Sequence, residues 1–321
     1  MKARFAFCLL LLLAACGQSQ SALHPAGEEA ARIHLLSLTL FAGAAIILLL
    51  VALTAWLAIR GPEGARTVLR APRMVVLAGI AVPVVTLSAL LTYGLWVMAK
   101  SSAPGGAPAA RIVVTAEQWW WRVSYARADG AAVESANEIR IPVGREVELE
   151  LHSGDVIHSF WVPALAGKLD MIPGRTHRLR LSAARPGIYR GQCAEYCGGA
   201  HAWMAFEVIA MPGAEFAAWL AAAAMPAPAT AGRGAALFQA TGCGACHRIA
   251  GTAATGTIGP DLTRVGARRF IGAAMLPQTP ENLSRFIADA QHFKPGAGMP
   301  PFGFLADADL AALSAYLSGL R

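Results

Sequence analysis

The sequence predicts a multidomain membrane protein that consists of a two-helix transmembrane hairpin, an all-β sandwich or barrel and a small all-α domain. Two apolar stretches near the N-terminus each exceed the roughly 20 residues needed to cross a bilayer. Short segments of alternating polar and apolar residues follow, and the pattern changes to helical spacing after residue 231. Only 15% of the residues are charged, against about 25% in an average soluble chain. This composition excludes an ordinary cytosolic enzyme.

The charge distribution does not favour a nucleic-acid partner. The 27 Lys and Arg residues exceed the 20 Asp and Glu residues, which gives a formal net charge of +7. No region of the chain concentrates this excess into the basic stripe that binding to a phosphate backbone requires. We therefore predict no nucleic-acid binding.

Residues 1–15 are predicted to be a lipoprotein-type signal peptide. Lys2 and Arg4 precede an apolar run, and the small residues at its end come directly before Cys16. A cysteine after Leu-Ala-Ala resembles the bacterial lipoprotein site, so Cys16 is predicted to be lipidated and to become the mature N-terminus. Cleavage at an ordinary Ala-x-Ala site is the alternative. Residues 16–32 then form a periplasmic N-terminal segment.

Residues 33–100 are predicted to form the transmembrane hairpin, with helices at about 33–59 and 74–98. A pair of buried core helices is the alternative, but neither stretch has a polar face. The loop between them is basic and contains Arg60, Arg66, Arg70 and Arg73. Because basic loops stay in the cytoplasm, residues 101–321 are placed outside. The predicted location is the bacterial inner (cytoplasmic) membrane, multi-pass, with both later domains on the periplasmic side.

Residues 101–224 are predicted to form the β domain, after a Ser-, Gly- and Pro-rich start at 101–108. Val147, Leu149 and Leu151 alternate with charged residues, as in a half-buried strand. A helix is expected over 212–224. Seven or eight short strands of this kind favour a sandwich or barrel. The expected strands are residues 111–116, 118–126, 137–143, 146–151, 156–162, 177–181, 188–192 and 203–209.

A Pro- and Ala-rich linker, residues 225–231, leads to the all-α domain at 232–321. Asp307 is expected to cap the last helix. A helical unit of this size commonly needs a bound group for stability. Arg268 and Arg269 are interpreted as solvated charges. The expected helices are residues 233–241, 280–291 and 307–320.

The all-α domain contains the attachment motif of a covalent haem. Cys243, Cys246 and His247 form C-x-x-C-H, in which two thiols bind the vinyl groups and the imidazole faces the iron. A zinc or redox C-x-x-C is the competing interpretation. A second axial ligand is expected because a thioether raises the reduction potential of haem. Met299, before the last helix, is the candidate, and Met275 is its rival.

The β domain contains a cluster of soft metal ligands. Cys193, Cys197, His201 and Met204 lie within twelve residues, and His158 lies upstream. Thiolates, imidazoles and a thioether suit copper, and two thiolates so close in sequence can bridge two metals. A disulfide between the two cysteines is the alternative, but it leaves the histidines and the methionine unexplained.

The motif C-x-E-x-C-x-x-x-H-x-x-M, with Asp-Val-Ile-His-Ser-Phe-Trp upstream, resembles the CuA motif of cytochrome c oxidase subunit II. Residues 165–175 look like a loop of that family, and the last domain resembles a class I cytochrome c, as in caa-type bacterial oxidases. The resemblance implies a cupredoxin fold and a dinuclear copper centre CuA. The implied copper ligands are Cys193 and Cys197 as bridges, His158 and His201 as terminal ligands, and Met204 and the Glu195 carbonyl as weak ligands.

The same resemblance implies further roles. The Glu195 carboxylate would help to hold a magnesium ion shared with subunit I, and Trp119 would be the residue through which electrons enter CuA. Trp120 and Trp121 are interpreted as packing or subunit contacts. The family often has a glutamate about two turns before the proline of its second membrane helix, but residues 74–82, directly before Pro83, contain no carboxylate.

The implied function is that of a subunit of a respiratory terminal oxidase, cytochrome-c oxidase. One haem c accepts electrons from an external donor, such as a cytochrome c or a quinol-cytochrome c reductase, and CuA passes them to subunit I for the reduction of oxygen to water. The oxygen-reducing site lies in another chain, so no catalytic residue is expected here. The alternatives are the CuA subunit of a nitric oxide reductase and an exported copper-binding or copper-delivery protein.

Overall fold

The computed structural model describes residues 20–101, 106–127, 132–227 and 231–321. The predicted signal peptide, Cys16 and parts of the segments 101–108 and 225–231 lie outside the described residues. The chain divides into two compact units, residues 31–106 and residues 107–321 together with the residues before 31.

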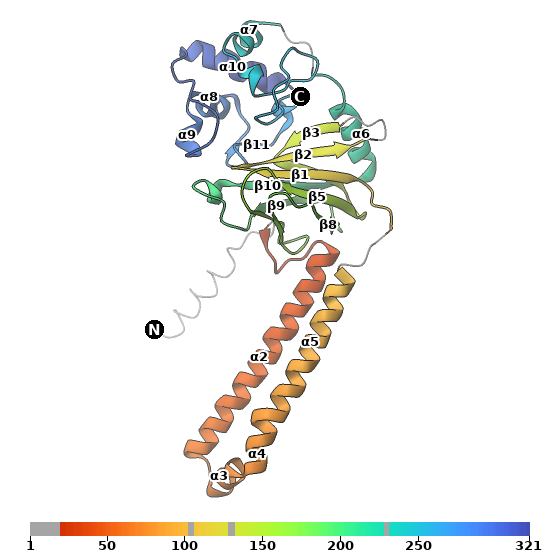
Figure 1. The fold of residues 1–321 in the computed structure, drawn as a ribbon, viewed down its shortest axis with the longest axis vertical. Helices are drawn as coiled ribbons and strands as arrows, with labels where there is room; N and C mark the ends of the chain where they lie inside the picture. The colour runs from red at the N-terminus through yellow and green to blue at the C-terminus, as the bar shows by residue number, and fades with distance from the viewer. Residues whose placement is uncertain (1–19, 102–105, 128–131, 228–230) are drawn as a thin grey trace, which may run out of the picture. The chain divides into compact units, whose positions relative to one another are not determined.

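The first unit contains the two apolar helices that the sequence predicts (Figure 1). Each is long and apolar enough to cross a membrane, and the most apolar window of each is not buried inside the protein. The first begins before the predicted Ile33, because two glutamates at its start are favourable near a helix N-terminus. A short helix occupies the predicted basic loop. The elements are α2 (Glu28–Arg60), α3 (Glu63–Arg70), α4 (Pro72–Val76), the π-helical turn η2 (Leu77–Ala81) and α5 (Val82–Ser101).

The β domain is a sandwich of two five-stranded sheets, which confirms the predicted all-β class. Most neighbouring strands are antiparallel, but β1 pairs with β5 and β10 pairs with β4 in parallel. The first sheet has the order β3 (Ala132–Ala136), β2 (Trp120–Ala126), β1 (Arg111–Glu117), β5 (Val147–Ser153) and β8 (His177–Leu181). The second has the order β4 (Glu138–Pro142), β10 (Ala205–Met211), β9 (Gly187–Cys193), β6 (His158–Trp161) and β7 (Leu169–Met171).

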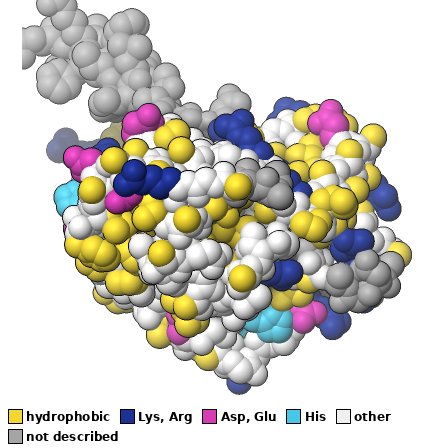
Figure 2. All heavy atoms as spheres, turned by 90° about the horizontal axis from the view of Figure 1, so that it is seen from above, with side chains coloured by type: hydrophobic (Ala, Val, Ile, Leu, Met, Phe, Trp, Pro, Cys, Tyr) yellow, Lys and Arg dark blue, Asp and Glu magenta, His cyan; other side chains and the backbone are white. Residues whose placement is uncertain are grey.

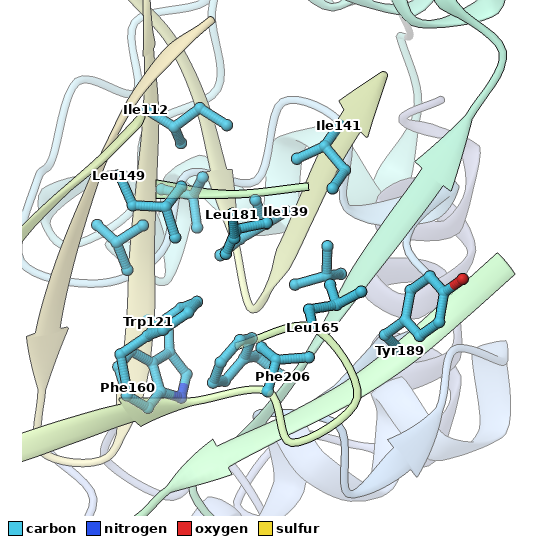
Figure 3. Close-up of a cluster of buried hydrophobic side chains, with 14 of the residues drawn as sticks. Ile112, Trp121, Ile139, Ile141, Leu149, Phe160, Leu165, Leu181, Tyr189 and Phe206 are labelled. Carbon is cyan, nitrogen blue, oxygen red and sulfur yellow. The ribbon is translucent and has the colours of Figure 1, made fainter. Parts of the chain in front are cut away.

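The core of the sandwich lies between the alternating inner faces of the two sheets (Figure 3). At one end Trp121, Phe160 and Phe206 form an aromatic cluster, with ring centroids 4.6 to 5.9 Å apart. Such ring pairs add about 0.5–1.5 kcal/mol each to the burial of apolar area. Trp121 is therefore a core residue, whereas Trp120 stacks under the guanidinium of Arg122.

Two strands of the β domain, β3 and β7, were not predicted, and the predicted strands 118–126, 137–143 and 156–162 are shorter in the structure. β3 and β4 flank Asn137, whose φ of 61° lies in the left-handed region. Its side-chain oxygen accepts a hydrogen bond from the Trp121 amide at 2.9 Å, which stabilises the turn. The chain therefore changes sheets at Asn137, and the expected strand 137–143 begins only at Glu138. The three-residue β7 is too short to show an alternating pattern.

The helical domain confirms the predicted all-α class, with two differences at helix ends. The predicted helix 280–291 breaks at Asp289, because its carboxylate accepts a hydrogen bond from the His292 amide and starts a new helix. Asp307 is the first residue of the last helix and not its cap; the cap position is Ala306. The β domain ends with the helix α6 (Gly213–Ala223). The elements of the helical domain are α7 (Arg233–Ala240), η4 (Cys243–Ala245), η5 (Val265–Ala267), β11 (Phe270–Ile271), β12 (Leu276–Pro277), α8 (Pro280–Ala288), α9 (Ala290–Phe293) and α10 (Asp307–Gly319).

The surface carries charges of both signs. On the face drawn in Figure 2, basic and acidic side chains are interspersed with apolar ones among the coloured residues.

Candidate metal centre and haem site

The soft ligands of the β domain meet where two strands of the second sheet end. His158 begins β6, Cys193 ends β9, and these strands pair with Phe160 opposite Cys193. The loop after β9 then returns over this edge, because the Ala194 amide donates to the Ser159 carbonyl at 3.0 Å. The short helix η3 (His201–Trp203) carries His201. Strand pairing thus brings His158 to a loop that follows it by 35 residues.

The donor atoms of these residues form a continuous chain, buried except at His201, which is half-buried. The two thiol sulfurs of Cys193 and Cys197 lie 3.8 Å apart. The Cys193 sulfur lies 3.8 Å from His158 Nδ1. The Cys197 sulfur lies 3.5 Å from His201 Nδ1 and 3.8 Å from Met204 Sδ. The cysteines are free thiols, and this set of two sulfurs, two imidazoles and a thioether fits copper.

One of the two thiols, that of Cys193, favours the ionised form that binds metal. The hydrogen bond between the two thiols lowers the pKa of Cys193 to about 4, and the imidazole of His158 contributes to this shift. The same pairing raises the pKa of Cys197. Burial opposes a charge on His158, but its contacts with Cys193 and Asp155 outweigh burial and raise its pKa. The site therefore favours negative charge on the Cys193 sulfur, which suits a copper cation.

Asp155 orients the His158 ring. Its carboxylate lies 2.7 Å from His158 Nε2, which leaves Nδ1 facing the sulfur of Cys193. The other carboxylate oxygen accepts from the Gln118 amide at 2.6 Å. The sequence contained Asp155 in the upstream motif, but we assigned it no role. An Asp three residues before a ligating His was the signal that could have identified it.

The backbone carbonyl and the side-chain carboxylate of Glu195 contact different partners. Its carbonyl oxygen lies 3.2 Å from the Cys193 sulfur, near the metal ligands. Its carboxylate is half-exposed, and the Lys168 ammonium lies 3.7 Å from it and 3.5 Å from Asp170. The magnesium ion stays a prediction, because its remaining ligands are expected from another chain.

Trp119 lies directly against the metal ligands. Its indole Nε1 donates to the Cys197 carbonyl at 3.0 Å, and Gln118 Nε2 donates to the same oxygen at 2.7 Å. The indole is buried. Its geometry is compatible with the predicted transfer role, and the Gln118 contact had no signal in the sequence.

The haem motif forms a tight turn in the helical domain. Cys243 and Cys246 lie at the two ends of η4, and the His247 amide donates to the Cys243 carbonyl. His247 Nδ1 lies 2.8 Å from the Pro260 carbonyl, so Nε2 is free for iron. Burial lowers the pKa of His247, which keeps the ring neutral for ligation. A Cβ on Gly259 would lie 2.5 Å from the His247 ring, so glycine is required there.

The structure places Met299 in the half-buried shell of the helical core, in the loop after α9. Gln291 Nε2 donates to the Met299 carbonyl at 3.2 Å. Met275 lies in a different segment, between β11 and β12. Met299 as the axial ligand stays a prediction.

The helical domain contacts the β domain through residues that the sequence interpretation missed. Arg269, interpreted as solvated, donates to Glu207 at 2.9 Å through its guanidinium and to Glu138 at 2.5 Å through its amide. Lys294 is 4% exposed and donates to the Trp119 carbonyl. Both contacts join residues far apart in sequence, and a long-range contact has no local pattern.

Two protein families match the chain. The family described as cytochrome C oxidase subunit II, periplasmic domain, matches residues 124–211, and the family described as cytochrome c matches residues 231–321. The chain is 40% identical over 214 residues to a cytochrome c oxidase subunit 2 of Alkalihalophilus pseudofirmus and 29% identical over 222 residues to that of Bacillus subtilis. Each match covers 65% of this chain and 61% of the relative's own length.

Solved structures give a partial likeness. The periplasmic domain of subunit II of cytochrome oxidase of Bradyrhizobium japonicum is 32% identical, with a TM-score of 0.34. The match covers 36% of this chain and 94% of that one.

Proposed function

We propose that this chain is a member of the cytochrome c oxidase subunit II family that ends in a cytochrome c domain, and that it brings electrons into a respiratory terminal oxidase. It would accept them from an external donor at its helical domain and deliver them through its β domain to subunit I. The complex, and not this chain, would reduce oxygen to water.

The observation that carries the proposal is the unbroken chain of buried soft donors from His158 through Cys193 and Cys197 to Met204. A copper-delivery protein needs exposed ligands from which the metal can leave. Here His158 is 0% exposed and the two cysteines are 4% and 3% exposed. A site of this kind retains its metal, which favours electron transfer over delivery.

The folded β domain holds the proposed copper ligands rigidly and shields them from water. Copper and haem, when bound, supply one-electron carriers. Paired strands hold His158 and Cys193, and the buried rings of Trp121, Phe160 and Phe206 pack behind them. Because interiors packed in this way resist small shifts, the ligands would move little when the charge of the site changes.

In the helical domain, Cys243 and Cys246 would hold the haem covalently and His247 would ligate its iron, with Met299 as the second axial ligand. The hydrogen bond from His247 to Pro260 supports this role, because it fixes the orientation of the ring.

The proposal includes the membrane anchor, the domain limits and the contact with subunit I. The two apolar helices would anchor the chain in the bacterial inner membrane as a multi-pass protein, with both domains on the periplasmic side and Cys16 lipidated. The proposed domain limits are 33–100 for the hairpin, 101–224 for the cupredoxin domain and 232–321 for the cytochrome c domain. Glu195 would share a magnesium ion with subunit I.

The test is to purify the full chain in detergent and to measure bound copper, bound iron and the near-infrared absorption of a dinuclear copper centre. We expect two copper ions and one haem per chain. Cys197→Ser should abolish the near-infrared band and leave the haem spectrum unchanged, because an alkoxide does not replace a bridging thiolate for copper. Retention of the band in Cys197→Ser would contradict the ligand assignment. The haem type of the large subunit that co-purifies would distinguish oxygen from nitric oxide as the acceptor.

A further inference from the structure

Lys294 is an unusual lysine because it is almost completely buried. Its side chain is on the helical domain, directly after α9, and only 4% of the residue is exposed. Its ammonium donates to two carbonyl oxygens, those of Trp119 and of Gly272, the latter at 3.2 Å, and forms no ion pair with a carboxylate among the described residues. The nearby Cys197 partly offsets the effect of burial on its charge. A buried cation held by two carbonyls is costly.

The backbone around Lys294 fits closely against Trp119. Gly296 has a φ of 86°, and a Cβ there would lie 2.9 Å from the Trp119 indole. A Cβ on Gly198 would lie 3.1 Å from the same indole. The indole therefore fits closely against a glycine of the helical domain and a glycine of the metal-binding loop. At both positions the absence of a side chain permits this approach.

The same loop carries the predicted haem ligand Met299. Gln291 organises it, because its side-chain oxygen accepts from the Gly296 amide at 2.9 Å and its side-chain nitrogen donates to the carbonyls of Ala297 and Met299. On the opposite side, the indole of Trp119 donates to the carbonyl of Cys197. Trp119 thus contacts a proposed copper ligand directly and the loop of the proposed haem ligand through Gly296.

We propose that Lys294 is a positioning residue that seats the Met299 loop on Trp119 and so fixes the path between the two cofactor sites, a role that rests on the proposed function. Its two hydrogen bonds join the backbone of the β domain to the backbone of the helical domain. Burial lowers the pKa of this lysine to about 7, in agreement with its enclosed position. The contact of Arg269 with Glu207 and Glu138 is a further attachment between the two domains. Arg122 and Arg190 of the β domain also donate to carbonyls of the helical domain, those of Thr257 at 2.7 Å and Ala274 at 3.4 Å.

The test compares Lys294→Met with Arg233→Met in the full chain. Methionine keeps the length and apolar stem of lysine but removes both hydrogen bonds. The control removes one positive charge from an exposed ion pair with Asp309 inside the helical domain. Amide hydrogen exchange of the peptides that contain residues 118–121 and 291–299 is measured in the metal-free chain. Electron transfer from the haem domain to the β domain is timed after photoreduction of the loaded chain.

We expect Lys294→Met to accelerate exchange in both peptides and to slow the transfer at least tenfold, with unchanged haem and copper spectra. Its thermal unfolding midpoint should be equal or higher, because a buried charge is removed; a purely structural lysine would lower it. Arg233→Met should change none of these. If Lys294→Met lacks the haem spectrum, Lys294→Gln, which keeps a polar donor, is measured in its place.

Two results would overturn the role of Lys294: unchanged exchange in both peptides, or accelerated exchange with an unchanged transfer rate. Failure of the proposed function is recognised separately. In that case the unaltered chain, with both cofactors bound, transfers no electrons between its domains, and this result would remove the positioning role as well.

Discussion

Asp155 provides the sharpest test of how the β domain holds its proposed copper site. One carboxylate oxygen lies 2.7 Å from both His158 Nε2 and the Val156 amide, and the other accepts from the Gln118 amide at 2.6 Å. An amide at this position has one acceptor oxygen in place of two. In Asp155→Asn the NH2 group must therefore face one of these three donors, and the negative charge beside the imidazole is lost.

The expected loss of copper affinity in the Asp155 variants follows from what a hydrogen-bond partner does for a ligating histidine. Removing the hydrogen-bond partner of a ligating histidine typically lowers metal affinity by about 10- to 100-fold, which is about 1.4–2.7 kcal/mol of binding free energy. We expect Asp155→Asn near the lower limit and Asp155→Ala near the upper limit, because alanine removes all three contacts. The free energy of unfolding should fall by only about 1–2 kcal/mol, since the Asp155 side chain is 32% exposed.

The assay is competition for copper between the full chain and a chelator of known affinity. Glu150→Gln is the matched control, since Glu150 lies 3.0 Å from His152 Nε2 in a similar pair that includes none of the proposed copper ligands. The reasoning would be refuted if Asp155→Asn bound copper within twofold of the unaltered chain. It would also fail if Glu150→Gln lost as much affinity.

Two further predictions test the haem site and the β core. Met299→Ala should leave the haem covalently attached but lower its reduction potential, measured by redox titration, because iron loses a thioether ligand; the same drop in Met275→Ala instead would reverse the assignment. Tyr125→Phe should lower the free energy of unfolding by about 1–3 kcal/mol in denaturant titrations, because the Tyr125 hydroxyl accepts from the Arg140 amide at 2.6 Å and donates to the Arg140 carbonyl at 3.2 Å, and both part-buried groups would lose this partner. The more exposed Tyr189→Phe should cost less, and equal losses would contradict the argument.

The sequence alone determined the features that depend on neighbouring residues. Apolar runs of sufficient length predicted the two membrane-type helices, because bilayer thickness and helical rise set that length directly. The motifs around Cys193 and Cys243 predicted a copper ligand set and a haem attachment site, because their residues are close enough in the chain to act together. The class of each domain followed in the same way from the period of its apolar residues.

The tertiary structure decided the features that join distant segments. It showed that the chain changes sheets at Asn137, since a side-chain contact with the Trp121 amide stabilises a left-handed turn that propensity does not reveal. It also gave Asp155 its role beside His158. Lys294 and Trp119 lie 175 residues apart, and only packing brings them together. Hydropathy and spacing report the local environment of a residue, whereas its distant partners depend on strand register and domain contacts, which form only in the folded chain.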